Sequence, residues 1–538
     1  MSRSNPTVLF GFFVAVIAAM CGAALLKGGL YLGKHEGDTF HLLQIVFRMA
    51  DGQVPHLDFM TPIGIMAFAP IALFVKIGYG AGISIILGQL LVSIVLLPAV
   101  WWVAHSRMQG LLPYLFGLFV LVLATALVHG EAQRSVSISM HYNRWAWAAA
   151  FIAISAAVIP TIDRARPMAD GVIIGLAMSF LLLTKITYFA AFAMPVLIAM
   201  LLRGSYRTLL VSALSGMIAA ALVTMIAGVD FWQAYLRDLL IVARSDIRSN
   251  PSEAFGAVVG APAYLGASLI LIAGVILLRQ SREAVGGLVL LLLVPGFFYV
   301  TYQNSGNDPQ WLLLLGVLLI AFLPELGLRN GFGWDMRSAL KVTAAIALAM
   351  AAPSFFNLAY SPFRHLNVDV EKYTPILPRS AQHADLFATK LRAIRTDTSV
   401  PLDIVGTGLE AYEYMVERPE PIVFQGAVLA QCELTLGMSA WFDVITADLE
   451  NAGLSGDKSI FAADLFSSHW LFGDFKPLAG GAPWYYGGLP GIGAADYVLV
   501  PLCPIIPEVR RMILETIEKN EIGLTEVRRT SLYILYAL

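Results

Sequence analysis

Residues 8–26 read VLFGFFVAVIAAMCGAALL, an uninterrupted apolar run that begins shortly after Arg3. A helix of about 20 apolar residues crosses the hydrocarbon core of a bilayer, so this run predicts a membrane span. The run is longer than the core of a signal peptide and lacks a clear A-x-A cleavage site, which favours a retained anchor. The fold is therefore expected to begin in a membrane.

The composition of the whole chain agrees with this start. Of its 538 residues, 58% are hydrophobic and 13% are charged, and the mean hydropathy is +0.73. Soluble globular chains carry about 25% charged residues, so the composition excludes a soluble enzyme. A net charge of -2 provides no overall field that would attract nucleic acid, and we expect no nucleic-acid partner.

Apolar segments close to the length of a membrane span recur as far as Tyr360. We expect about eleven spans, which makes the chain a polytopic α-helical membrane protein. The segments are Val8–Leu32, Gly82–Ala104, Leu111–Val128, Trp145–Pro160, Gly171–Thr184, Tyr188–Leu202, Thr208–Gly228, Ala263–Leu278, Ala284–Tyr302, Trp311–Leu328 and Val342–Tyr360.

The segment Pro62–Val75 decides the topology, because it is apolar but shorter than a span. If it does not cross, every basic short loop falls on the side of Arg3, as expected for cytoplasmic loops. We therefore predict that it is juxtamembrane or re-entrant, that the N-terminus is cytoplasmic and that the tail lies outside. The basic residues concerned are Arg107, Arg164, Arg166, Arg203, Arg207, Arg279, Arg282, Arg329, Arg337 and Lys341.

Two features of the expected outer side have a structural interpretation. From Asp38 to Met49, the polar residues share one helical face, which predicts an interfacial helix with Gly37 and Asp38 at its N-terminus. Thr184, Lys185, Ile186 and Thr187 separate two short spans and predict a turn-around with a lysine at its tip. That lysine either snorkels or binds an anion.

The tail has the residue pattern of a soluble domain, and it holds 22 of the 37 acidic residues. We expect a membrane domain over residues 1–360 and a separate extracytoplasmic α/β domain over residues 361–538. Its predicted strands are Pro401–Gly406, Asp496–Pro501 and Glu526–Leu538, its predicted helices are Leu409–Val416 and Glu508–Asn520, and Gly480–Gly493 is predicted to be a long loop.

The chain has three cysteines, Cys21 in the first apolar run and Cys432 and Cys503 in the tail. Their spacing does not match a structural zinc site. If the tail lies in an oxidising compartment, Cys432 and Cys503 could form a disulfide. Their spacing in the sequence does not decide whether they do. The tail also lacks the glycine-rich phosphate loops of nucleotide-binding proteins, and no nucleotide or redox cofactor is expected.

The first outer loop contains Glu36-Gly37-Asp38, then the predicted helix, then Gly52, Pro55, Asp58-Phe59, Pro62 and Gly64. This order resembles the first extracytoplasmic loop of the GT-C superfamily, integral-membrane glycosyltransferases that use polyprenyl-phosphate-linked sugars. The resemblance extends more weakly to the membrane half and the tail. It implies an enzyme of a bacterial inner membrane, with a periplasmic tail, that transfers a sugar with inversion to a glycan, lipid or protein acceptor.

The resemblance implies roles for individual residues. Asp38 is the expected base, with a helix cap as its structural alternative, and Glu36 orients the acceptor or binds a metal. A divalent ion, Mg²⁺ or Mn²⁺, is an open requirement, with Glu36, Asp38 and Glu131 as its candidate ligands. The superfamily often has a second acidic motif in its next outer loop, where this chain has only Glu131, and this departure puts a two-carboxylate site in doubt.

Further candidates would bind substrate. Arg144 and Lys185 either hold the donor phosphate or snorkel. His56 and His141 either assist phosphate binding, ligate a divalent ion or are structural, and Asn143 is a further candidate for substrate binding. Asp58 is a candidate whose simpler role is to fix the turn before Phe59. A further outer segment is interpreted either as a binding surface for the lipid headgroup or as a solvated amphipathic helix. It contains Trp232, Tyr235, Arg237, Asp238, Arg244 and Arg248, while Asn304, Asn307 and Asp308 are interpreted first as turn formers.

Two other classes of function remain open. A transporter or lipid flippase would place ionisable residues near the middle of the membrane and show repeated, broken helices, whereas the charges here concentrate at the ends of the spans. A non-catalytic protein of polysaccharide assembly or export would keep the topology without needing Asp38. A transfer assay with labelled polyprenyl-phosphate sugars separates the three.

Overall fold

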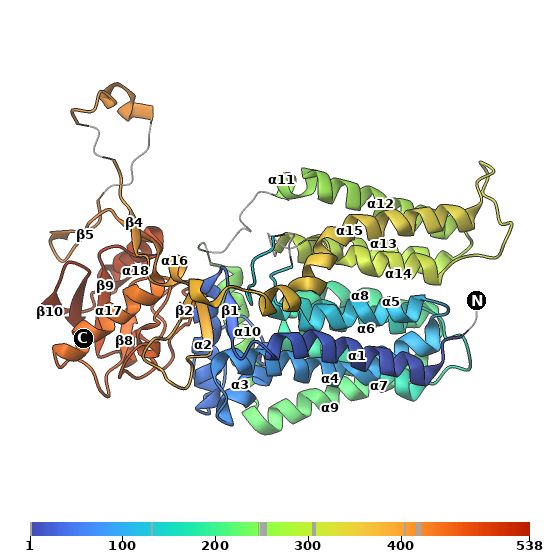
Figure 1. Ribbon diagram of the computed structural model, residues 1–538, viewed down its shortest axis with the longest axis horizontal. Helices are drawn as coiled ribbons and strands as arrows, with labels where there is room; N and C mark the ends of the chain where they lie inside the picture. Colours follow the sequence, from blue (N-terminus) through green and yellow to red (C-terminus); the bar gives the residue numbers. More distant parts are fainter. Residues whose placement is uncertain are drawn as a thin grey trace. The chain divides into compact units, whose positions relative to one another are not determined.

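The computed structural model describes residues 3–130, 133–245, 247, 255–303, 308–402, 405–415 and 421–538 (Figure 1). The chain groups into two compact units. Unit 1 comprises Met1–Gly33, Ile63–Val229 and Asn250–Val368, and unit 2 comprises Lys34–Pro62, Asp230–Ser249 and Asp369–Leu538. The first loop and one later segment thus belong to the same unit as the tail.

Unit 1 consists mainly of long helices that run side by side (Figure 1). They are α1 (Pro6–Leu25), α3 (Ala69–Lys76), α4 (Ala81–Arg107), α5 (Leu112–Thr125), α6 (His141–Val158), α7 (Pro167–Thr184), α8 (Ile186–Leu202), α9 (Tyr206–Ala227), α11 (Phe255–Gly260), α12 (Pro262–Gln280), α13 (Ala284–Gln303), α14 (Trp311–Ala321) and α15 (Met336–Leu366), with the strand β1 (Leu30–Leu32) and the 3-10 helix η1 (Ile65–Ala67).

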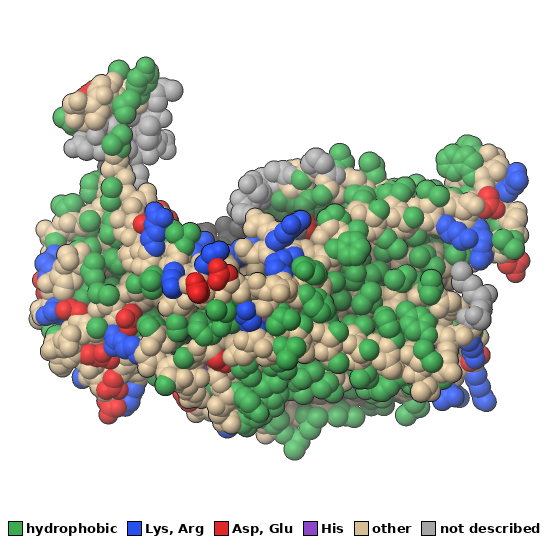
Figure 2. Space-filling model, viewed as in Figure 1, with side chains coloured by type: hydrophobic (Ala, Val, Ile, Leu, Met, Phe, Trp, Pro, Cys, Tyr) green, Lys and Arg blue, Asp and Glu red, His purple; other side chains and the backbone are tan. Residues whose placement is uncertain are grey.

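Seven helices within the described residues are long and apolar enough to cross a membrane: α1, α4, α7, α9, α12, α13 and α15. Three apolar helices, α5, α8 and α14, are shorter, and α14 has only 11 residues, about 16 Å at 1.5 Å per residue. The visible side of these helices is mostly hydrophobic (Figure 2). These helices are consistent with a polytopic membrane protein. The expected count of about eleven spans stays a prediction.

Helices α6, α7 and α9 show how unit 1 packs. All 18 residues of α6 are buried, so this helix lies inside the bundle rather than on its surface. Gly171 and Gly175 of α7 face α9 so closely that a Cβ atom on Gly175 would lie 2.4 Å from the carbonyl oxygen of Ser212. Small residues four apart allow two helix backbones to approach in this way.

The segment Pro62–Val75 forms η1 and most of α3 instead of a long helix. Helix α3 has eight residues, about 12 Å of helix, which is far less than the roughly 30 Å of a hydrocarbon core. This length agrees with the expected juxtamembrane or re-entrant segment.

Unit 2 contains short strands and several helices. The helices are α2 (Glu36–Ala50), α10 (Asp230–Ala243), η3 (Val370–Lys372), α16 (Lys390–Ala393), η4 (Glu410–Met415), α17 (Met438–Asn451), η5 (His469–Leu471), η6 (Ile492–Ala494) and α18 (Pro507–Lys519). The strands are β2 (Tyr373–Pro375), β3 (Leu386–Thr389), β4 (Asp397–Ser399), β5 (Val423–Phe424), β6 (Ala427–Val428), β7 (Glu433–Leu436), β8 (Ile460–Ala462), β9 (Tyr497–Pro501), β10 (Thr525–Arg529) and β11 (Tyr533–Ala537).

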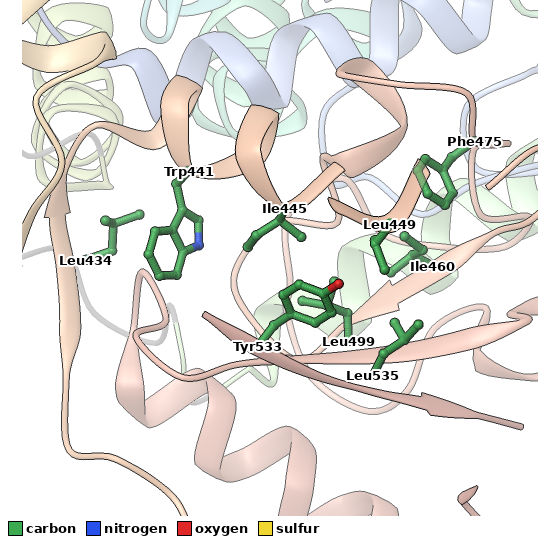
Figure 3. Close-up of a cluster of buried hydrophobic side chains, with 9 residues drawn as sticks. All are labelled: Leu434, Trp441, Ile445, Leu449, Ile460, Phe475, Leu499, Tyr533 and Leu535. Carbon is green, nitrogen blue, oxygen red and sulfur yellow. The ribbon is translucent and has the colours of Figure 1, made fainter. Parts of the chain in front are cut away.

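A four-stranded sheet of order β10-β11-β9-β8 forms the centre of the tail. Strands β8 and β9 are parallel, and the other neighbours are antiparallel. Side chains of the sheet pack against α17 in an apolar core, where Tyr533 lies opposite Ile445 (Figure 3). The whole core cluster is Leu434, Trp441, Ile445, Leu449, Ile460, Phe475, Leu499, Tyr533 and Leu535.

Several expected elements of the tail are present and others are not. Strand β9 and helix α18 match the predictions, and residues 480–493 are mainly loop. The prediction of a single strand over residues 526–538 is wrong, because this segment turns back at residues 530–532 and forms the hairpin β10–β11. The described residues of 401–406 form no strand, and within 409–416 only the 3-10 helix η4 forms.

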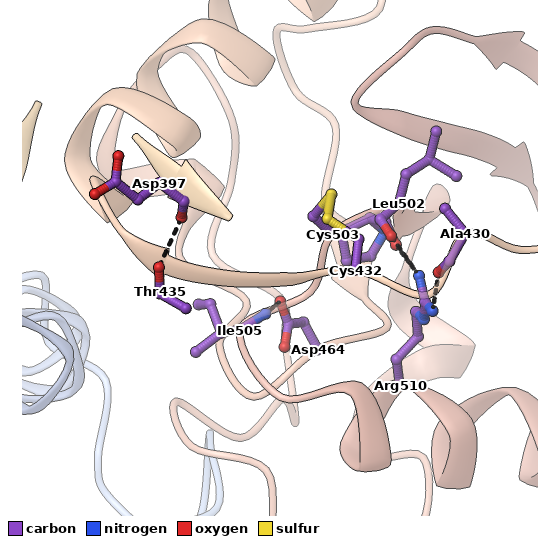
Figure 4. Close-up of a disulfide and its surroundings, with 10 residues drawn as sticks. Asp397, Ala430, Cys432, Thr435, Asp464, Leu502, Cys503, Ile505 and Arg510 are labelled. Atoms are coloured by element: carbon purple, nitrogen blue, oxygen red, sulfur yellow. Dashed lines mark hydrogen bonds between the residues drawn. A yellow bond between two sulfur atoms is a disulfide. The ribbon is translucent and has the colours of Figure 1, made fainter. Parts of the chain in front are cut away.

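Cys432 and Cys503 form a disulfide, and their Cα atoms are 4.6 Å apart (Figure 4). This bond joins the segment before β7 to the loop before α18, across a sequence separation of 71 residues. Disulfides persist in oxidising compartments and are rare in the cytosol. The bond therefore agrees with an extracytoplasmic tail.

Candidate functional site

Helix α2 carries the polar face that predicted an interfacial helix. That face does not point into water: Gln44 and Arg48 are 0% and 1% exposed. The Gln44 amide donates to the Ser468 hydroxyl and to the carbonyl oxygen of Pro483, at 2.9 and 3.0 Å. Arg48 donates to the carbonyl oxygen of Leu478 at 3.0 Å. An interfacial helix turns its polar face towards water, whereas here the tail supplies the hydrogen-bond partners of this face.

Arg48 is the charged centre of this buried face. Its guanidinium lies over the rings of Phe59 and Trp470, 5.4 and 5.5 Å from their centroids. Burial lowers the pKa of Arg48 to about 10, against the opposing charge of Asp58. Arg48 thus stays protonated at neutral pH and joins α2 to the following turn and to the tail.

Asp38 is partly exposed and lies in the first turn of α2. The structural alternative for Asp38, a helix cap, is wrong, because the residue before the helix is His35, with a left-handed φ of 64°. Asp38 is the third helical residue and not the cap, although a carboxylate in the first turn still interacts favourably with the helix dipole. Its assignment as the base stays a prediction.

Glu36 is the first residue of α2 and is 2% exposed. One of its carboxylate oxygens accepts a hydrogen bond from Arg392 Nε at 2.7 Å. A buried carboxylate that is already paired with a guanidinium is a poor ligand for a cation. Arg392 was missed from the sequence, because it lies 356 residues further along the chain.

The expected metal ligands do not form a visible metal-binding set. Among the residues that the structure describes, no three or more His, Cys, Asp or Glu side chains are grouped as metal ligands. Glu131 lies outside the described residues. The donor set of Glu36 and Asp38 does not fit a divalent ion well, since Arg392 already neutralises Glu36.

The turn after α2 packs on α10. His56 Nδ1 lies 3.0 Å from Asp238 Oδ2, and both side chains are fully buried. The backbone N–H of Thr61 also donates to Asp238, and Arg237 donates to the carbonyl oxygen of His56. His56 has a left-handed φ of 73°, which is uncommon outside glycine. Asp238 is therefore not on a solvated face, and His56 is placed as a structural partner of α10.

Asp58 is exposed and fixes this turn through its side chain. Its Oδ2 accepts a hydrogen bond from the backbone N–H of Val54 at 2.6 Å. This is the simpler of the two roles expected for it.

Three further residues that the sequence singled out, Arg248, Asn304 and Asn307, lie outside the described residues.

The predicted turn-around between α7 and α8 is present and receives the first loop's glycine. The N–H of Gly64 donates to the carbonyl oxygen of Thr184 at 3.1 Å. A Cβ atom on Gly64 would lie 2.1 Å from the carbonyl oxygen of Leu183, so only glycine allows this approach. Lys185 follows directly, with its Nζ 5.2 Å from the centroid of the Tyr142 ring.

The start of α6 brings three of the expected binding residues into the same region of unit 1. His141, Asn143 and Arg144 occupy its first turn, and all are at most 2% exposed. His141 Nε2 lies 2.8 Å from the carbonyl oxygen of Ala67, which ties α6 to η1. The Asn143 amide lies 3.4 Å from the sulfur of Met140. His141 is thus occupied by a backbone group.

Arg144 differs from its neighbours. It is 1% exposed, and its one hydrogen bond within the described part of the chain runs from Nη1 to the carbonyl oxygen of Leu123, at 3.3 Å. Its Nε and Nη2 have no partner among the described residues, and no carboxylate there pairs with it. An uncompensated buried charge costs several kcal/mol. The N-terminus of α6, where Arg144 lies, also favours anions.

Comparison with models of protein families gives no match, and comparisons with characterised proteins and with solved structures give none either.

Proposed function

We propose that this chain is a membrane glycosyltransferase that takes a sugar from a polyprenyl-phosphate donor and transfers it to an extracytoplasmic acceptor. The observation that carries the proposal is Arg144, a buried guanidinium at a helix N-terminus with two nitrogens that have no partner among the described residues. A lipid phosphate supplies the missing anion, and arginine binds phosphate through two parallel hydrogen bonds. The resemblance of the first loop supplies the sugar chemistry.

The proposed reaction needs a base and a stabilised leaving group. Asp38 takes the proton of an acceptor hydroxyl, whose oxygen attacks the anomeric carbon of the sugar. The bond between that carbon and the phosphate oxygen breaks, and the new negative charge stays on the lipid phosphate. Arg144 and Lys185 stabilise this charge. Attack from the opposite side inverts the anomeric centre.

The membrane sidedness is part of the proposal. We infer that the tail and the residue 126–141 segment lie outside a bacterial inner membrane, because this places the basic short loops inside. The Cys432–Cys503 disulfide supports an oxidising compartment for the tail. In a Cys21→Ala background, an impermeant maleimide should label a cysteine placed at Gly130 but not one placed at Gln109. The reverse pattern would overturn the orientation.

The decisive test is transfer by the purified full chain in nanodiscs. A panel of polyprenyl phosphates carrying labelled hexoses or pentoses is the donor, and a detergent extract of the source membrane is the acceptor. We expect label to move from at least one donor into a lipid, glycan or protein fraction. If a folded chain with an unchanged melting temperature transfers label from none of the donors, the glycosyltransferase proposal is rejected. Transport or polysaccharide assembly then remain as the candidate functions.

A further inference from the structure

A second pair of arginines lines a pocket in unit 1 that no step of the proposed reaction uses. The pocket has a volume of about 640 Å³, which lies within the range of small-molecule sites. Its lining residues are Arg134, Pro353, Phe356, Asn357, Tyr360 and Arg364. We call it the arginine pocket.

The protein holds both arginines at this pocket. The Asn357 amide donates to the carbonyl oxygen of Gln133 at 2.7 Å, which fixes the segment of Arg134 beside α15. The Arg364 guanidinium lies over the Tyr360 ring, 5.7 Å from its centroid. Arg134 is close enough to Arg364 for the two positive charges to repel each other.

No protein anion offsets this repulsion within the described part of the chain. Neither arginine forms an ion pair there, and Arg364 Nη1 is shielded from water without a hydrogen-bond partner. Elsewhere in unit 1, Arg107 pairs with Asp170 and Arg203 pairs with Glu283. Two neighbouring guanidiniums without a carboxylate indicate an anionic ligand with several acceptor oxygens.

The other half of the pocket is apolar. Pro353, Phe356 and Tyr360 are spaced three and four residues apart on α15 and are exposed, with Phe356 at 67% and Tyr360 at 55%. Helix α15 is one of the seven candidate spans, so this exposed stripe faces hydrocarbon in a bilayer. A ligand with a phosphate at one end and acyl chains at the other matches both halves.

We propose that the arginine pocket binds the phosphate of an anionic glycerophospholipid, whose acyl chains lie along Pro353, Phe356 and Tyr360. The stripe opens towards bulk lipid, where glycerophospholipids are the most abundant phosphates. The proposal does not depend on sugar transfer.

Native mass spectrometry of the full chain tests this assignment. Delipidated protein is titrated with dioleoylphosphatidylglycerol, with zwitterionic dioleoylphosphatidylcholine and with undecaprenyl phosphate, and inorganic phosphate is added as a competitor. We expect phosphatidylglycerol to bind most tightly and to resist millimolar inorganic phosphate. Arg134→Gln with Arg364→Gln should weaken its binding roughly 10-fold or more, since each arginine near an anionic lipid contributes about five-fold.

Controls keep the result interpretable. Arg207→Gln changes an exposed arginine of α9 outside the pocket and should leave lipid binding unchanged. Because Arg134 is exposed, Arg134→Gln alone should not disturb folding, and it should weaken binding about five-fold. Phe356→Ala, on the exposed stripe, should also weaken it. Equal affinity for the zwitterionic lipid, unchanged binding by Arg134→Gln, displacement by inorganic phosphate or preference for undecaprenyl phosphate would each overturn the proposal.

Discussion

Two arginines of unit 1, Arg144 and Arg364, differ from the arginines that hold unit 2 together. In unit 2, Arg392 pairs with Glu36, and Arg510 donates to the carbonyl oxygens of Pro501, Leu502 and Ala430 at 2.7 to 2.9 Å (Figure 4). Among the described residues of unit 1, Arg144 has a single long hydrogen bond and Arg364 lacks an ion pair.

The difference separates structural charge from charge that is available to a ligand. Protein groups satisfy most of the hydrogen bonding of the buried cations of unit 2, and the tail is held together through them. The unpaired arginines of unit 1 gain a partner only from outside the described protein. Substitution should therefore affect stability in the first case and ligand binding in the second.

The largest effect is expected for Arg510→Met. This change leaves three carbonyl oxygens without their donor and removes the positive charge near the buried Asp464. Breaking such a network costs about 3–5 kcal/mol, which corresponds to a fall in the melting temperature of the tail of roughly 10 °C. The melting temperature is measured by heating the full chain in detergent and monitoring unfolding of the tail by its cleavage with a protease.

Arg144→Met is the matched control for that comparison. It removes a buried charge that has no carboxylate partner among the described residues, so the melting temperature of the lipid-free protein should stay constant or rise. A loss of stability as large as that of Arg510→Met would show that Arg144 is structural, and the comparison between the units would fail.

Asp38→Asn tests whether unit 2 also carries a chemical group. Asn keeps the size of the side chain in the first turn of α2 but removes the base. We expect transfer to fall on the order of 100-fold or more, with unchanged melting and donor binding, because positioned proton transfer contributes that much. Turnover within a few fold of the wild type would reject Asp38 as the base and favour the transport or assembly functions.

The pH dependence of stability sharpens the account of unit 2. Burial raises the pKa of Asp464 to about 6, although the N–H groups of Leu465, Ile505 and Ile506 donate to it. The folded state thus holds this proton more tightly than the unfolded state, whose pKa is near 3.8. The contribution of Asp464 to stability is therefore largest below pH 4, falls as the pH rises to about 6, and is constant above.

A pKa rise of about two units corresponds to roughly 3 kcal/mol. Asp448 acts in the opposite sense, since the Arg528 guanidinium lowers its pKa. The difference in stability between the wild type and Asp464→Asn isolates the effect. This difference should change in favour of Asn between pH 4 and pH 7, and a difference independent of pH would contradict the raised pKa.

The sequence predicts local elements of this fold better than it predicts their partners. Apolar length located the helices of unit 1, and amphipathic spacing located α18. The polar face of α2 predicted an interfacial helix, and the sequence could not reveal its partners, because Ser468, Leu478 and Pro483 lie more than 400 residues away in the chain. Periodicity reports which residues share a face but not what covers it.

The candidate site shows the same limit. Arg144 was singled out by its position at the end of a span, but the sequence could not show that no carboxylate of the described residues pairs with it. The sequence left Glu36 and His56 as candidate site residues and could not show that Arg392 and Asp238 are their partners. These pairings connect residues more than 180 positions apart, so no local motif signals them.

The smallest expected effect concerns donor affinity and is the sharpest test of unit 1. Arg144→Gln removes the positive charge that is proposed to hold the lipid phosphate and leaves the acceptor side untouched. We expect the donor KM to rise on the order of 10-fold, with kcat changed much less, because the interaction exists before and during transfer. The matched variant Arg207→Gln, at an exposed arginine of the same unit, should leave both constants unchanged.

If Arg144→Gln instead lowers kcat and leaves the KM alone, Arg144 acts only on the charge that develops on the leaving phosphate. If neither constant changes, the guanidinium does not meet the donor, and its missing anion must be sought elsewhere.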